Sequence, residues 1–213
     1  MREVQAMEHK NGPHCVILAA MPVDARMRAY YEDADIVIAA DAGWRSAKAL
    51  GLVPDLLVGD YDSSPVPAGA EVLPCAKDDT DTHYAARRAL AMGAARVTIL
   101  GGTGGRLDHT LANLQTLLFL ERSGVHALLA DPDTEARALL PGTHEVRRLP
   151  GRYLSLFPAD GTARGVTLEG LKFPLQNACL EAQFPLGVSN EFAAETARIT
   201  LGEGALYLLL CKK

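Results

Sequence analysis

The sequence predicts an N-terminal α/β domain with a mostly parallel sheet and helices on both faces, followed by an all-β sandwich domain. Up to about residue 130, short apolar runs alternate with helix-like segments, which is typical of parallel strands connected by helices. From Thr134 onward, short β-like segments are separated by glycine or proline about every ten residues, as in sandwiches. We therefore expect domains at residues 14–132 and 133–213, preceded by a disordered extension at residues 1–13.

The elements of the first domain follow from apolar runs and from capping residues. Cys15–Ala20 is a continuous apolar run, as expected for a strand that is buried on both faces. Thr80 is a good N-cap, and Gly51, Gly93 and Gly124 are placed to end helices. We expect strands at residues 15–20, 35–40, 55–58, 71–74, 96–100 and 125–130, and helices at residues 24–32, 44–50, 81–92 and 108–121.

The second domain contains only short β-like segments between turn residues. We expect its strands at residues 135–140, 144–149, 153–157, 163–168, 179–184, 197–201 and 205–210.

Composition narrows the class of protein. The chain has 213 residues, 48% of them hydrophobic, and a net charge of −5, which argues against a general nucleic-acid binder. No apolar run is long enough to cross a membrane, and residues 1–13 lack the apolar core of a signal peptide. The four cysteines lie far apart without zinc-binding spacing, so we expect buried, reduced thiols and a cytoplasmic location.

Two carboxylates follow the third predicted strand. In an extended chain, Asp60 and Asp62 would point the same way, and two like charges side by side are costly without a cation between them. Mg²⁺ is the usual partner of such oxygen ligands. The alternative is that residues 62–65 form a polar turn, and this pentapeptide alone does not decide between the two.

Three further polar clusters follow predicted strands or begin helices at the same edge of the sheet, where open α/β sheets bind ligands. They are residues 41–43, 77–82 and 101–109. The glycines of the last cluster let backbone N–H groups approach a phosphate, and Arg106 can form paired hydrogen bonds with it. Asp60, Asp62 and Asp81 could share Mg²⁺ that neutralises a polyphosphate, with Lys77 as an added charge.

Each cluster also has a purely structural interpretation. The glycine-rich loop can be a tight connection, and Asp81 can serve only the helix dipole. His109 can be an ordinary residue at the start of a helix, and Asp41 can cap the helix that contains Trp44. The coincidence of four clusters at one edge favours metal-dependent phosphoryl or nucleotidyl chemistry.

The chain resembles the thiamine pyrophosphokinase family over nearly its whole length after Pro13. The resemblance depends on Ala-Asp-Ala-Gly at residues 40–43, on residues 54–63 and 77–82, and on the glycine-rich segment at residues 101–109, in this order and spacing. Residues 187–192 resemble the family's thiamine-contacting segment.

The resemblance implies an α/β catalytic domain that binds ATP, a β-sandwich domain that binds thiamine, and a homodimer with active sites at the subunit interface. The implied reaction converts ATP and thiamine into AMP and thiamine diphosphate, with Mg²⁺. The only tryptophan is Trp44, so Phe192 or a tyrosine is expected to stack on thiamine in place of the C-terminal tryptophan of some relatives. Rival functions are pyrophosphorylation of a hydroxymethylpterin and non-catalytic nucleotide or thiamine binding.

The resemblance assigns expected roles residue by residue. Catalytic roles fall on Asp60, Asp62, Asp81, Asp108 and Arg106, of which Asp60, Asp62 and Asp81 are the expected metal ligands. ATP-binding roles fall on Asp41, Gly43, Lys77, Thr82, Gly101, Gly102, Thr103, Gly104, Gly105 and His109. Thiamine-binding roles fall on Ser189, Asn190 and Phe192.

Overall fold

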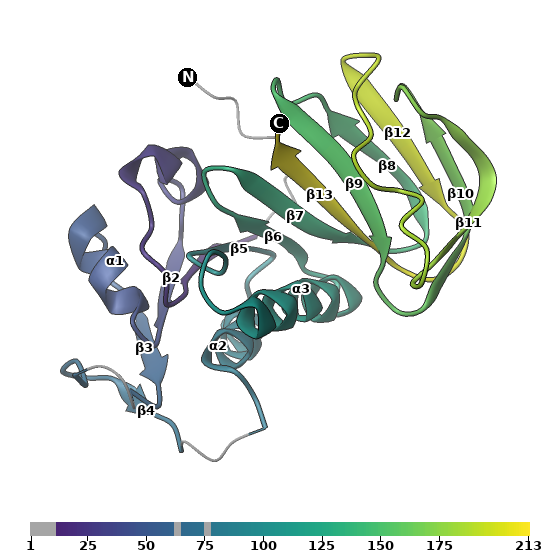
Figure 1. Ribbon diagram of the computed structural model, residues 1–213. Coiled ribbons are helices and arrows are strands. Elements are labelled where there is room, and N and C mark those ends of the chain that lie inside the picture. The colour runs from purple at the N-terminus through teal and green to yellow at the C-terminus, as the bar shows by residue number, and fades with distance from the viewer. Residues whose placement is uncertain (1–11, 62–64, 75–77) are drawn as a thin grey trace. The chain divides into compact units, whose positions relative to one another are not determined.

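The computed structural model describes residues 12–61, 65–74 and 78–213, and it divides into two compact units, Met1–Pro132 and Asp133–Lys213 (Figure 1). The first unit contains a parallel sheet with the strand order β4-β3-β2-β1-β5-β6. Its strands are β1 (His14–Leu18), β2 (Ile36–Ala40), β3 (Leu56–Gly59), β4 (Glu71–Val72), β5 (Arg96–Leu100) and β6 (His126–Ala130). Its helices are the 3₁₀-helix η1 (Ala25–Tyr30) and the α-helices α1 (Gly43–Leu50), α2 (Asp81–Ala91) and α3 (Leu107–Arg122).

Helices cover both faces of this sheet, which explains why its central strands are apolar throughout. On one face, Val16 and Leu18 pack with Met27, Tyr31 and Ala47, which come from η1, its C-cap and α1. On the other face, side chains of Ile99, Leu129 and Asn113 surround Gly102, which places α3 on that side, and α2 packs against α3. The prediction of an α/β unit is confirmed.

Local signals set several element ends. The Thr80 hydroxyl accepts a hydrogen bond from the His83 N–H and caps α2, as predicted. Gly51 ends α1 in the left-handed conformation, at φ 71°. The helix expected at residues 24–32 is instead the short 3₁₀-helix η1, and the strand expected at residues 71–74 has only two residues, Glu71 and Val72.

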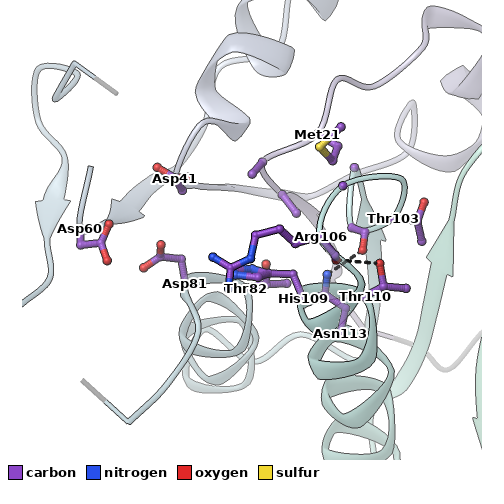
Figure 2. Close-up of a pocket in the computed structure, with 15 residues that line it drawn as sticks. Met21, Asp41, Asp60, Asp81, Thr82, Thr103, Arg106, His109, Thr110 and Asn113 are labelled. Carbon is purple, nitrogen blue, oxygen red and sulfur yellow. Dashed lines mark hydrogen bonds between the residues drawn. The ribbon is translucent and has the colours of Figure 1, made fainter. Parts of the chain in front are cut away.

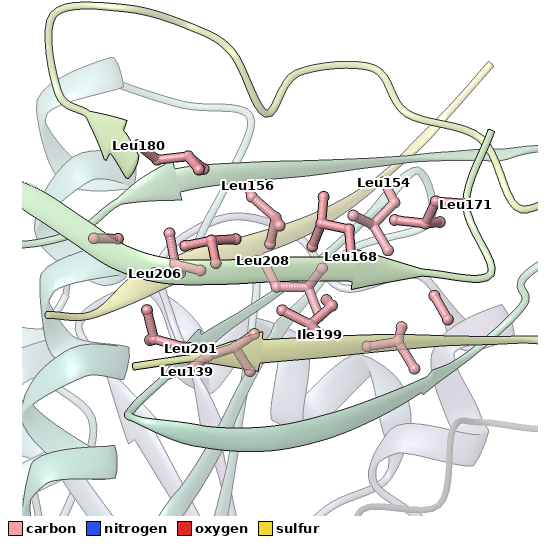
Figure 3. Close-up of a cluster of buried hydrophobic side chains, with 14 of the residues drawn as sticks. Leu139, Leu154, Leu156, Leu168, Leu171, Leu180, Ile199, Leu201, Leu206 and Leu208 are labelled. Atoms are coloured by element: carbon pink, nitrogen blue, oxygen red, sulfur yellow. The ribbon is translucent and has the colours of Figure 1, made fainter. Parts of the chain in front are cut away.

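The second unit consists of antiparallel strands in two groups, β7-β13-β9 and β11-β10-β12-β8. Leucine side chains from both groups, among them Leu156, Leu208, Leu168 and Leu201, form one buried cluster between them (Figure 3). This arrangement confirms the predicted sandwich. The strands are β7 (Thr134–Leu139), β8 (Gly142–Arg147), β9 (Arg152–Pro158), β10 (Thr162–Glu169), β11 (Leu175–Glu181), β12 (Thr196–Leu201) and β13 (Leu206–Lys212).

The described cysteines differ in burial, although all were expected to be buried. Cys15 is fully buried in β1, and burial, together with the charge of Asp55, raises the pKa of its thiol to about 12. Cys179 is exposed on β11, which lies at the end of its sheet, so the expectation of a buried thiol is wrong there. Within the described ranges, no helix is both long and apolar enough to span a membrane.

Candidate active site

A cavity of about 410 Å³ lies in the first unit where the parallel strands end (Figure 2). Its walls come from the segments that follow β1, β2, β3 and β5, from the first turn of α2 and from the first two turns of α3. The topology brings these segments together because the carboxyl ends of parallel strands meet at one edge of the sheet. The lining residues are Ala19, Ala20, Met21, Asp41, Asp60, Asp81, Thr82, Gly101, Gly102, Thr103, Gly105, Arg106, His109, Thr110 and Asn113.

Three acids, Asp41, Asp60 and Asp81, gather at one end of the cavity (Figure 2). One carboxylate oxygen from each lies within 4.8 Å of the others, and all three side chains are half-buried. Asp41 Oδ1 is buried and has no hydrogen-bond partner among the described residues. Carboxylates held this close repel one another, and a divalent cation with oxygen preference would offset that repulsion. We call these three residues the acid cluster.

The geometry corrects one sequence argument. Asp60 and Asp62 were expected to point the same way in an extended chain, but β3 ends at Gly59 and Tyr61 has φ 52°. A left-handed residue between them breaks the alternation of an extended strand. The structure places Asp41 and Asp81 beside Asp60, whereas Asp62 lies outside the described residues, as does Lys77.

The capping interpretation of Asp41 is wrong. The N-cap of α1 is Ala42, and this helix start has no side-chain capping hydrogen bond. The backbone N–H of Asp41 instead donates to the Val58 carbonyl, 2.8 Å away. Gly43 does not line the cavity; a Cβ there would lie 1.9 Å from the Leu18 carbonyl oxygen, so glycine is needed for α1 to pack against β1.

The glycine-rich loop forms the opposite end of the cavity. Gly101 has φ 70°, and a Cβ at this position would lie 2.3 Å from the Met21 carbonyl oxygen, so only glycine fits. Asn113, buried on α3, donates its side-chain amide to the Gly102 carbonyl at 2.8 Å. The Thr103 hydroxyl bonds to the Asp131 carboxylate. These contacts fix the loop conformation; Gly105 also lines the cavity, whereas Gly104 does not.

Arg106 lines the cavity, and Figure 2 shows its side chain extending from the glycine-rich loop toward the acid cluster. Its guanidinium forms two hydrogen bonds with the Asp108 carboxylate, Nε–Oδ1 at 3.1 Å and Nη2–Oδ2 at 2.5 Å. This pairing lowers the pKa of Asp108 and raises that of Arg106. Asp108 is exposed and does not line the cavity, whereas His109 does.

The expected thiamine residues lie in the second unit and differ in exposure. Asn190 is buried, and its side chain bonds to both backbone groups of Phe173, accepting from N–H at 3.0 Å and donating to C=O at 2.7 Å. Ser189 is exposed at φ 59°, and its N–H donates to the Ser155 hydroxyl at 3.0 Å. Phe192 is half-buried against the leucine cluster.

Two family models match most of the chain. The model described as "Thiamin pyrophosphokinase, catalytic domain" matches residues 27–129. The model described as "Thiamin pyrophosphokinase, vitamin B1 binding domain" matches residues 143–206. The chain belongs to the thiamine pyrophosphokinase family. The acid cluster and the glycine-rich loop belong to the segment that the catalytic-domain model matches. Ser189, Asn190 and Phe192 belong to the segment that the vitamin B1 binding model matches.

Individual thiamine pyrophosphokinases agree with this assignment. A curated relative from Bacillus subtilis strain 168 is 28% identical over 191 residues, which cover 84% of this chain and 89% of the relative. A crystal structure of the Bacillus subtilis thiamine pyrophosphokinase has a TM-score of 0.84 at 26% identity and covers 94% of this chain and 99% of that chain. The structure from Geobacillus thermodenitrificans has a TM-score of 0.81 at 28% identity, with coverage of 94% and 98%.

Five residues that line the cavity of this family member are absent from the site predicted from the sequence: Ala19, Ala20, Met21, Thr110 and Asn113. Thr110 and Asn113 lie four and seven positions after Arg106, which is the spacing of one helical face. That periodicity was the available signal for both. Met21 gave no such signal. Its N–H donates to the Gly101 carbonyl at 3.0 Å, and its side chain lies against Gly105.

Proposed function

We propose that this chain is a thiamine pyrophosphokinase that transfers the pyrophosphoryl group of ATP to the hydroxyl of thiamine, giving thiamine diphosphate and AMP. The observation that carries the proposal is one cavity with an acid cluster at one end and a glycine-rich loop with Arg106 beside it. Carboxylates that can hold a cation and donors that can hold phosphates are the two requirements of phosphoryl transfer.

The acid cluster fits Mg²⁺ on the chemistry of its donors. Three carboxylates supply oxygen ligands, and one oxygen of each lies within 4.8 Å of the others, so a divalent cation would offset their repulsion. Mg²⁺ bound there would neutralise part of the polyphosphate charge. We assign Asp41, Asp60 and Asp81 to this role; the assignment of Asp62 and Lys77 stays a prediction from the sequence.

The remaining groups bind and orient ATP. Backbone amides of the glycine-rich loop and the guanidinium of Arg106 hold the phosphates and stabilise charge as it develops. Thr82 and His109 line the same cavity and complete its polar wall. We propose that Asp108 acts by orienting Arg106, because a carboxylate paired in this way, with a lowered pKa, is a weak proton acceptor.

In the reaction, the thiamine hydroxyl oxygen forms a bond to the β-phosphorus of ATP. The bond from that phosphorus to the oxygen bridging to the α-phosphorus breaks, and AMP leaves with that oxygen. The hydroxyl proton passes to solvent, because Asp81, the first residue of α2, is assigned to the cation. A loose phosphoryl transition state demands little base catalysis, so this proton transfer is a minor part of the barrier.

The second unit supports thiamine as the acceptor. The vitamin B1 binding model covers residues 143–206, which favours thiamine over a hydroxymethylpterin. We propose that the Ser189–Phe192 segment contacts thiamine. Asn190 would act there mainly by holding the Phe173 backbone, since that contact already occupies its amide group.

The proposal includes a homodimer with its active sites at the subunit interface and a cytoplasmic location. Three apolar side chains shortly before Ser189 are exposed: Phe184, Leu186 and Val188. Exposed apolar side chains that lie close together are typical of surfaces that a partner subunit covers. Light scattering of the purified protein would detect the dimer as twice the mass of the chain.

Product analysis tests the function. Protein mixed with ATP, Mg²⁺ and thiamine is expected to give AMP and thiamine diphosphate in equal amounts, and hydroxymethylpterin in place of thiamine is expected to give no product. An Asp81→Asn protein, prepared identically, controls for contaminating kinases. ADP with thiamine monophosphate, or no turnover by the native protein, would contradict the proposal.

A further inference from the structure

Tyr61 carries a buried hydroxyl that the proposed chemistry leaves without a role. The residue directly follows Asp60, is 5% exposed and has φ 52°. Its hydroxyl oxygen is buried and has no hydrogen-bond partner in the described part of the chain. A buried, unpaired hydroxyl and a left-handed non-glycine residue both cost stability, and such costs are characteristic of functional sites.

The Tyr61 ring turns back toward the acid cluster. Its Cζ, the carbon that bears the hydroxyl, is 3.4 Å from the position that a Cβ would take at Gly59, and that position is 3.0 Å from Cα of Asp41. Because Gly59 has no side chain, the Tyr61 ring has room to approach Asp41. The carboxylates that act electrostatically on the hydroxyl are those of Asp41 and Asp81.

Two unsatisfied groups of opposite kind thus lie on the same side of Gly59. The Tyr61 hydroxyl is a donor without an acceptor, and Asp41 Oδ1 is a buried acceptor without a donor, within the residues described. A tyrosine hydroxyl is a hydrogen-bond donor at neutral pH, so it can donate to a carboxylate. Carboxylates that bind metal ions are usually oriented by such outer hydrogen bonds.

We propose that Tyr61 is a positioning residue of the acid cluster, whose hydroxyl donates a hydrogen bond to the Asp41 carboxylate when the cluster holds a divalent cation. One Asp41 oxygen then faces the cation while Tyr61 holds the other. Because this hydrogen bond forms only when the cation is bound, the unpaired hydroxyl lowers the stability of the cation-free protein. The inference depends on the proposed function only through the divalent cation.

The test is Tyr61→Phe, which removes the hydroxyl and keeps the ring. Mn²⁺ is the probe, and its binding is measured by electron paramagnetic resonance without nucleotide or thiamine. We expect the Mn²⁺ dissociation constant to rise about tenfold, as for other outer-sphere partners. We also expect the thermal midpoint without metal to stay at or above the native value, because an unsatisfied buried group is gone. Tyr31→Phe, at a buried tyrosine in the apolar cluster beneath η1, should leave Mn²⁺ affinity unchanged.

Three outcomes would overturn the inference. The first is a Tyr61→Phe protein that binds Mn²⁺ as tightly as the native protein. The second is a loss of Mn²⁺ affinity with a metal-free thermal midpoint several degrees lower, which would indicate general loosening of the fold. The third is a native protein that binds no Mn²⁺. Thiamine diphosphate formation by the native protein is measured separately, so failure of the inference is distinguishable from failure of the proposed function.

Discussion

Replacing Asn113 should weaken both the fold and ATP binding, although the proposed chemistry gives Asn113 no direct role. Asn113 is 4% exposed, and its amide donates to the Gly102 carbonyl at 2.8 Å. In Asn113→Ala, the carbonyl of the buried residue Gly102 loses this donor. An unsatisfied buried acceptor costs about 1–3 kcal/mol, so we expect a loss of about 2 kcal/mol. For a chain of this length, that corresponds to a thermal midpoint about 4–8 °C lower.

The effect on kinetics should be selective, because Gly102 belongs to the loop that is proposed to hold the phosphates of ATP. We expect KM for ATP to rise about tenfold, equivalent to about 1.4 kcal/mol, with little change in KM for thiamine. Asn113→Asp tests the donor itself, since it keeps the side-chain shape but replaces the N–H donor by a carboxylate; it should be at least as harmful as alanine.

Thermal unfolding and initial rates at varied ATP check both parts. Gln115→Ala is the matched control, because Gln115 is an exposed amide on the same helix. An Asn113→Asp protein with native stability and native KM for ATP would refute the reasoning, since the hydrogen bond to Gly102 would then contribute nothing.

Three further predictions follow from the same geometry. Asp81→Asn should lower kcat about 100-fold or more by removing a ligand of the acid cluster; a rate within a few-fold of native at saturating Mg²⁺ would exclude that role. Arg106→Lys should lower kcat/KM for ATP about 10- to 100-fold, because lysine cannot make paired hydrogen bonds with phosphate; equal kinetics would show that charge alone suffices. Burial, with the charge of Arg96, lowers the pKa of His14 from 6.5 and outweighs the opposing effect of Asp33. The unfolded chain therefore binds the proton more readily, so stability should fall as pH drops below about 6.5, and His14→Gln should flatten the dependence of the thermal midpoint on pH.

Most of the fold could be predicted because its signals are local. β5 coincides with the predicted strand, since a run of β-branched and apolar residues between Ala95 and Gly101 leaves little choice. The sequence predicts a strand at residues 179–184, whereas β11 spans Leu175–Glu181. Within this strand only Leu180 is buried, so its apolar pattern is too weak to locate its start. β11 is an edge strand, and which of its residues are buried depends on how the sheet packs, which the local sequence pattern does not show.

The acid cluster shows where local reasoning about a site fails and what would replace it. Two acids two residues apart suggested a pair made within one segment, Asp60 with Asp62. The structure brings Asp60 beside Asp41, which follows the neighbouring strand β2, while Asp62 lies outside the described residues. Ala40 of β2 lies opposite Val58 of β3, so in parallel register Asp41 comes opposite Gly59 and next to Asp60. Once two strands are known to be parallel neighbours, the residues just past their ends become the best candidates for a shared site, ahead of residues close in sequence. Tyr61 depends on the same strand end. It leaves β3 in the left-handed conformation, and its ring therefore turns back over Gly59 toward Asp41. If the strand continued to Asp62, the Tyr61 side chain would point to the face opposite the acids.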